Sequence, residues 1–120
     1  MANEITVNAA LRVSNGNLNF SRDFGSKTFD QTAAGGPTPC FLTVGTAEES
    51  VAFGELSTVG WLAMENLDDT NYVEWGFATG VYGGRLEAGE PALFRLNPST
   101  TLYLKADTAD CKVNVYALED

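Results

Sequence analysis

The side chains that could do chemistry in this chain are mainly carboxylates and two cysteines, because the chain contains no histidine. Histidine is the commonest general base, so a serine or cysteine nucleophile here lacks its usual partner. Sixteen Asp and Glu residues remain, and two of them could in principle hydrolyse a glycosidic bond. The carboxylates fall in expected turns and at strand ends, and nothing in the pattern isolates a pair. We therefore expect solvated surface charge and no enzymatic activity.

One turn gathers oxygen atoms that could bind a cation. Asn66, Asp68, Asp69 and Asn71 crowd a short stretch, and oxygen ligands on a tight loop can hold calcium. Their spacing is not that of an EF-hand, and Asn and Asp commonly cap turns by hydrogen bonding to their own backbone. The glycines precede no Lys-Ser/Thr signature of a phosphate loop. We predict a capped turn, with no metal and no cofactor.

Cys40 and Cys111 are the two cysteines, and neither belongs to a C-x-x-C pair. This spacing argues against a zinc site or a redox motif. In a chain made in the cytoplasm, two thiols are expected to be reduced and buried. A disulfide between them stays open as an alternative.

Charge is distributed unevenly along the chain. Seven basic and sixteen acidic residues give a net charge of −9. The first 40 residues carry three of each sign, so the entire excess lies in residues 41–120. A chain this acidic repels phosphate, which argues against nucleic-acid binding. The chain begins without a basic, apolar signal sequence, and no apolar run approaches the roughly 20 residues that span a bilayer. We expect no membrane partner.

The elements that position these side chains are short strands. Residues 5–13 alternate strictly between apolar and other side chains, which predicts a half-buried strand. Asn15-Gly16 then predicts a tight hairpin turn into a second strand from residue 18. Residues 23–26 suggest another turn and 27–32 a third strand, and two glycines and two prolines in 33–39 mark a break in the chain.

Two interpretations of the N-terminal part remain open. Residues 1–39 could form a neutral hairpin arm in front of an acidic compact body at 40–120. They could equally supply ordinary strands of one sandwich that spans residues 1–120. In the arm interpretation, the alternating apolar residues form an interface with a partner through β-augmentation: Ile5, Val7, Ala9, Leu11 and Val13.

The remaining sequence predicts further short strands separated by turns, at residues 41–45, 48–54, 60–67, 71–77, 81–82, 91–96, 101–106 and 111–118. This spacing predicts an all-β fold, a single β-sandwich of jelly-roll or Greek-key type. We expect most of the core to come from Phe53, Trp61, Trp75, Phe77, Phe94, Leu102 and Leu104. Four tyrosines fall on the opposite faces of these strands, where they could pack across strands, meet a partner or bind sugar: Tyr72, Tyr82, Tyr103 and Tyr116.

Several segments resemble a recurrent pattern of small structural proteins of tailed bacteriophages. Residues 66–73 match "N-L-D-x-T-N-Y-V", and residues 86–96 match "L-x-A-G-E-x-A-L-F-R-L". Residues 11–17, 44–49, 102–109 and 116–120 also fit, so the resemblance covers most of the chain.

The resemblance is specific for a virion or morphogenesis protein. It is less specific for the location in the particle, where it suggests a capsid decoration or cement protein that binds the outer surface of the head and stabilises it. Its implied partner is the major capsid protein, and a binder at three-fold positions would itself be a trimer. The chain would be made in the host cytoplasm and end in the virion. The alternative is a tail, neck or baseplate component, or a small receptor- or glycan-binding module. A tail glycan hydrolase is a third hypothesis.

Overall fold

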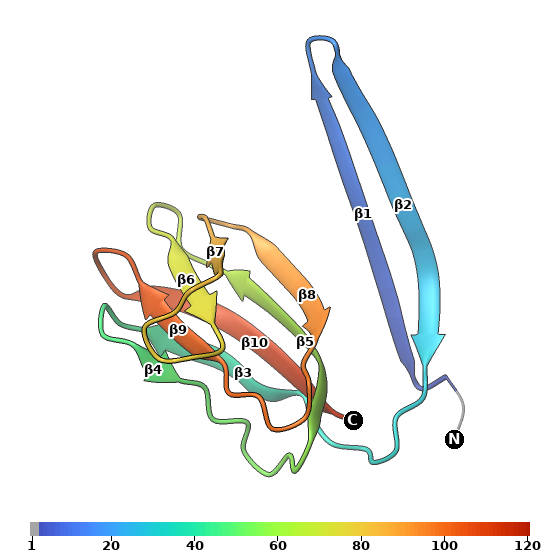
Figure 1. Ribbon diagram of the computed structural model, residues 1–120, viewed down its shortest axis with the longest axis vertical. Helices are drawn as coiled ribbons and strands as arrows, with labels where there is room; N and C mark the ends of the chain where they lie inside the picture. The colour runs from blue at the N-terminus through green and yellow to red at the C-terminus, as the bar shows by residue number, and fades with distance from the viewer. Residues whose placement is uncertain (1–2) are drawn as a thin grey trace. The chain divides into compact units, whose positions relative to one another are not determined.

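The computed structural model describes residues 3–120, and these form ten strands. Their contacts divide the chain into two compact units, Met1–Thr32 and Ala33–Asp120. We call the strands of the first unit the hairpin and the second unit the body. Both are shown in Figure 1. The predicted all-β class is confirmed, because every regular element in the described residues is a strand in an antiparallel sheet.

The hairpin consists of β1 (Ile5–Asn15) and β2 (Leu18–Phe29), which pair with each other. Asn15 lies opposite Leu18, so the turn has two residues, Gly16 and Asn17. Gly16 has a φ of 57°, in the left-handed region that glycine enters without a steric penalty. The Asn-Gly signal therefore located the turn correctly.

The predicted turn at residues 23–26 is wrong, because β2 runs through it. Asn8 lies opposite Ser26 while Ala10 lies opposite Asp23, so Phe24 and Gly25 together face Ala9. This is a β-bulge, and Gly25 provides the positive φ of 71°. The expected third strand at 27–32 is the far end of β2, which continues to Phe29.

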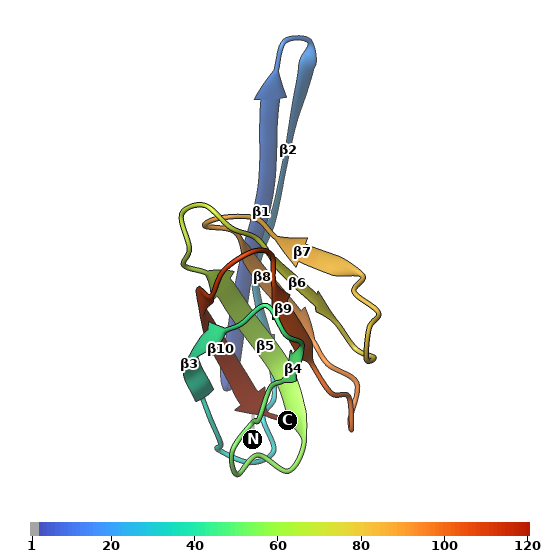
Figure 2. The same cartoon turned by 90° about the vertical axis from the view of Figure 1, so that its left-hand side faces the viewer.

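The body contains two four-stranded sheets, each ordered differently from the sequence. One sheet has the order β3-β10-β5-β8, and the other has the order β4-β9-β6-β7. In Figure 2, β3, β10 and β5 lie to the left of β9, β6 and β7. The strands are β3 (Thr38–Val44), β4 (Glu49–Ser50), β5 (Val59–Asn66), β6 (Val73–Gly76), β7 (Gly84–Leu86), β8 (Pro91–Arg95), β9 (Tyr103–Ala106) and β10 (Cys111–Glu119).

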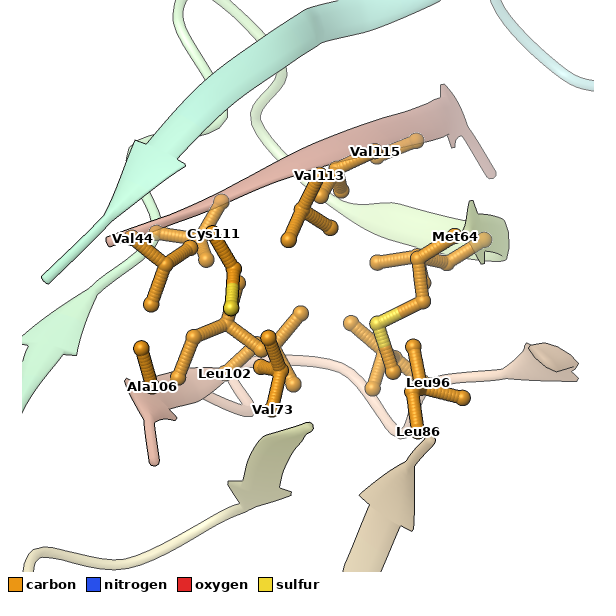
Figure 3. Packing of buried hydrophobic residues seen from close by; sticks show 14 residues of the cluster. Val44, Met64, Val73, Leu86, Leu96, Leu102, Ala106, Cys111, Val113 and Val115 are labelled. Carbon is orange, nitrogen blue, oxygen red and sulfur yellow. The ribbon is translucent and has the colours of Figure 1, made fainter. Parts of the chain in front are cut away.

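The core of the body lies between these two sheets, which gives a β-sandwich-like structure. Val113 and Val115 of β10 and Met64 of β5 point toward Val73 of β6 and Ala106 of β9 (Figure 3). β10 alternates strictly, with Cys111, Val113, Val115 and Ala117 fully buried, as its period-two pattern predicts. Burying a side chain of this kind contributes roughly 1.5–3 kcal/mol.

Two of the expected core aromatics lie elsewhere. Phe77 follows the end of β6 and is 49% exposed. Trp61 lies between buried Gly60 and Leu62 on β5, so its ring belongs to the outer face of the sheet. Leu102 and Leu104 are fully buried as predicted, whereas Phe53, Trp75 and Phe94 are partly buried against the core.

Two buried polar side chains hold the ends of the body strands. Asn66, at the end of β5, is fully buried, and its Nδ2 donates to the carbonyls of Asn71, Leu86 and Glu87 at 2.9, 3.1 and 3.3 Å. Glu119, at the end of β10, accepts hydrogen bonds from the Ser57 N–H and hydroxyl and from the Thr58 N–H. Asn66 therefore ties the end of β5 to the segments at residues 71 and 86–87, and Glu119 ties the end of β10 to the loop at residues 57–58.

Candidate interaction surface

The two strands of the hairpin together make one apolar and one polar face. Residues directly opposite in an antiparallel pair project to the same side. Ile5 lies opposite Phe29, Leu11 opposite Arg22 and Val13 opposite Phe20. We define the apolar face by its apolar members, which are Ile5, Val7, Ala9, Leu11 and Val13 of β1 and Leu18, Phe20, Phe24 and Phe29 of β2.

The bulge at Gly25 is what keeps the apolar face continuous. Along β2, even-numbered residues such as Phe20 lie on this face before the bulge, and odd-numbered residues such as Phe29 lie on it after the bulge. Because the bulge uses two residues opposite one, it reverses the alternation of β2 relative to β1. Without it, Phe20 and Leu18 would project to the opposite side from Leu11 and Val13.

Most of this apolar face is exposed to solvent. Leu11 is 63% exposed, Leu18 56% and Phe20 50%. Of the five interface residues expected from the sequence, Ile5 is buried, Val7 is half-buried, and the other three, Ala9, Leu11 and Val13, are exposed. Exposed apolar patches of this extent are typical of interaction surfaces, and a lone two-stranded hairpin is marginally stable in water.

The half of this surface that β2 supplies was not predicted from the sequence. Leu18, Phe20 and Phe24 recur at even positions, and this alternation was the available signal. The turn expected at residues 23–26 would end the pairing of the two strands there. With that turn assumed, Phe24 could not be placed on the same face as Leu18 and Phe20.

Both charged residues on the apolar face are basic. Arg22 lies opposite Leu11, and Lys27 lies opposite Val7. The Arg22 guanidinium also sits 5.1 Å from the centre of the Phe24 ring, in cation–π contact. The one carboxylate within the hairpin strands, Asp23, lies opposite Ala10 on the polar face. The exposed apolar face is therefore also cationic.

The oxygen-rich turn after β5 is held together by its own backbone. Asp68 Oδ2 accepts hydrogen bonds from the Thr70 and Asn71 N–H groups at 3.0 and 2.6 Å. These bonds, led by the one from Asn71, hold the pKa of Asp68 below its ordinary value. Among residues 3–120, no group of three or more His, Cys, Asp or Glu side chains could hold a metal ion.

The two cysteines are free thiols in the structure, so no disulfide joins them. Cys111 is fully buried, and burial raises the pKa of its thiol. Cys40 is only partly buried, which differs from the expectation that both would be buried. Its Sγ lies 3.4 Å from the Pro37 carbonyl.

The tyrosines of the body make local contacts. The Tyr82 hydroxyl donates to Glu48, and this hydrogen bond raises the pKa of Tyr82 to about 12. The ring of Tyr72 stacks under Arg85, whose guanidinium carbon lies 3.8 Å from the ring centre. Such contacts are those of side chains packing across strands.

A second, smaller apolar surface lies at one edge of the body. Trp75 stacks on Phe94 with ring centres 5.0 Å apart, and the edge of Phe77 meets both rings. A shallow cavity of about 400 Å³ opens beside them, lined by Trp75, Gly76, Phe77, Ala78, Val81 and Gly83. Its lining is almost entirely apolar.

Comparison of the chain with models of known protein families, with curated proteins and with solved structures gives no match. The described part of the chain forms no helix long and apolar enough to cross a membrane.

Proposed function

We propose that this protein is a structural component of a bacteriophage virion, a decoration or cement protein that binds the outer surface of the head and stabilises it. The observation that carries the proposal is the hairpin, which exposes an apolar face along both strands. Such a face is stable only when another protein surface covers it. The resemblance of residues 66–73 and 86–96 to phage structural proteins is the reason for placing the protein in a phage particle.

The strand order of the body supports this assignment. We propose that the body is a jelly roll, the sandwich of two Greek keys that is common in viral capsid domains. Its sheets combine early and late strands in the orders β3-β10-β5-β8 and β4-β9-β6-β7. This interleaving of the two ends of the chain is the arrangement that two Greek keys produce.

The distribution of charge also fits a protein on the outside of a head. The body carries 13 acidic and 4 basic residues from Phe41 onward, while the first 40 residues are neutral. An acidic body stays soluble and is repelled by packaged nucleic acid. In this proposal the hairpin contacts the partner, either the major capsid protein or another copy in a trimer. The role needs no cofactor or metal, no membrane contact and no catalysis.

A second candidate function is a tail, neck or baseplate component, or a small glycan-binding module. The apolar cavity beside Trp75 and Phe77 favours it, because sugar rings present C–H faces that pack on aromatic rings. In that case few copies would be present, set by the symmetry of the tail.

The test is the copy number of this protein in purified virions, measured by quantitative mass spectrometry against the major capsid protein. A ratio near one to one, or one trimer for each three-fold site, is the expected result. A handful of copies would favour the tail or neck, and absence from the particle would contradict both candidates.

A further inference from the structure

The tip of the hairpin joins the two groups that a spontaneous modification of asparagine needs. The side-chain amide of Asn15 precedes the backbone nitrogen of Gly16, a residue without a side chain. Asn15 is exposed, and a Cβ built on Gly16 would meet no atom within 4 Å, its chain neighbours aside. The Gly16 nitrogen can therefore approach the Asn15 side chain without steric hindrance.

We propose that Asn15 is a site of spontaneous deamidation and isomerisation, asparagine being one of the thermally labile residues. The Gly16 backbone nitrogen attacks the Asn15 side-chain carbonyl carbon, Cγ, and the new C–N bond closes a five-membered imide. The bond between Cγ and the amide nitrogen breaks, and ammonia leaves with the proton that Gly16 has lost. Water then hydrolyses the imide. Cleavage between Cγ and the ring nitrogen gives aspartate, and cleavage at the main-chain carbonyl carbon gives isoaspartate.

The other asparagines lack one or both of these features. None of them precedes a glycine. Asn17 lies in the same exposed turn, but it precedes Leu18, whose branched side chain crowds the attacking nitrogen. Asn66 in the body is fully buried, and its amide donates to three carbonyl groups. Asn15 is therefore the favoured site.

The place of Asn15 at the end of β1 makes the reactive conformation accessible. The attack requires the Asn15 backbone to rotate out of the strand conformation. Asn15 is the last residue of β1 and pairs with Leu18 across the two-residue turn. Opening this one pair is enough, and the ends of exposed elements open at low cost in free energy. The sheet of the hairpin has only two strands, so no third strand holds the pair closed.

Both products change the apolar face of the hairpin at its tip. Asn15 lies opposite Leu18, in the row next to Val13 and Phe20. Aspartate places a negative charge there. Isoaspartate adds the same charge and one extra carbon atom to the main chain, so the turn no longer keeps residue 15 in register with Leu18. A weaker contact with a partner would follow. That effect on binding rests on the proposed function, whereas the modification itself does not.

The test follows the modification in the purified full chain at mildly alkaline pH. Trypsin cleaves after Arg12 and Arg22, so residues 13–22 form one peptide that contains both Asn15 and Asn17. Mass spectrometry should show conversion of amide to acid at Asn15 at least about tenfold faster than at Asn17, a difference of about 1.4 kcal/mol at the transition state. Two products of equal mass and different retention are expected, aspartate and isoaspartate.

Two variants remove one reacting group each. N15Q keeps an exposed amide, but attack would have to close a six-membered ring, so conversion at residue 15 should slow about tenfold or more. G16N keeps Asn15 and places a side chain beside the attacking nitrogen, and asparagine is among the residues that adopt a positive φ most readily. It should slow the conversion of Asn15 as well. The matched control N17Q changes the neighbouring amide in the same turn and should leave the rate at Asn15 unchanged.

A synthetic peptide of residues 13–22 gives the rate of the unfolded segment. Conversion of the full chain within about tenfold of this rate would mean that the tip opens at a cost below about 1.4 kcal/mol. Stronger protection, or equal rates at Asn15 and Asn17, would overturn the inference. If Asn15 converts but the protein is absent from particles, only the proposed function fails. If the protein coats the head but Asn15 of the purified chain stays intact, only this inference fails.

Discussion

The hairpin and the body use the same period-two pattern for opposite purposes. In β10 of the body, the apolar side chains Val113, Val115 and Ala117 are fully buried. In β1 of the hairpin, the apolar side chains Leu11 and Val13 remain exposed. Both strands alternate, but a facing sheet covers the first set and nothing within the hairpin covers the second.

This contrast shows that alternation predicts which face of a strand avoids water, but not which molecule covers it. A half-buried strand belongs to the core when a second sheet of the same unit lies within packing distance, about 10 Å. The hairpin has no second sheet of its own, so its apolar face is available to a partner. We therefore expect the body to carry the stability, and the proposed function gives assembly to the hairpin.

The largest expected difference is between leucines in the two regions. Leu104→Ala in β9 removes a fully buried side chain and should lower the free energy of unfolding by about 3 kcal/mol. Leu11→Ala should change it by less than about 0.5 kcal/mol, because the side chain is exposed in the hairpin. Chemical denaturation of both variants measures the comparison. Equal losses would place Leu11 in a core.

Asn66 and Asn19 provide a polar version of the same comparison. Asn66→Ala leaves three carbonyl groups without their side-chain donor and should destabilise the body by about 2 kcal/mol. Asn19→Ala, on the exposed polar face of β2, should be close to neutral. Thermal unfolding of the two variants measures both effects. A neutral Asn66→Ala would show that water replaces the amide.

Gly25 tests whether the bulge sets the faces of the hairpin. Its φ of 71° disfavours any side chain, so Gly25→Ala should cost about 1 kcal/mol locally, although open space surrounds the position. We expect weaker assembly without loss of body stability. Gly83→Ala is the matched control, since that site is also open and has no positive φ. Equal assembly of the two variants would contradict the role given to the bulge.

The smallest expected effect is a pH dependence of the stability of the body. Hydrogen bonds from Thr58 and Ser57 hold the pKa of Glu119 below its ordinary value, which means that the folded state favours the charged carboxylate. The resulting stability is present above the ordinary pKa and is lost as the pH falls toward the lowered one.

Glu119→Gln should therefore lose less stability than the wild type between neutral and acid pH. Thermal unfolding across that range measures the slope, and Glu55→Gln, exposed in a nearby loop, is the matched control. A slope unchanged by Glu119→Gln would show that other groups carry the acid sensitivity.

Local signals in the sequence predicted the parts of the fold that depend on neighbouring residues. Strict alternation placed β1 and β10, and Asn15-Gly16 placed the hairpin turn. The strand β7 (Gly84–Leu86) was not predicted, because its three residues begin with the second of two glycines and carry no alternation. The bulge at Gly25 was also interpreted as a turn, since a glycine with positive φ serves in either.

Features that depend on long-range pairing could not be predicted from these signals. Trp61 was expected in the core because of its size, yet its neighbours Gly60 and Leu62 take the inward positions on β5. The order of strands in the two sheets sets which face of β5 is inward, and no local pattern encodes that order. For the same reason, the five interface residues of β1 were recognised without their counterparts on β2.

The most direct test of the assembly role of the hairpin is to remove it. A fragment of residues 33–120 should keep the circular dichroism of a β protein and a cooperative unfolding transition, because the packed core cluster between the two sheets lies within it. It should also sediment as a monomer and fail to bind particles. A fragment that loses its cooperative transition would show that the hairpin belongs to the core, and one that still assembles would show that another surface holds the partner.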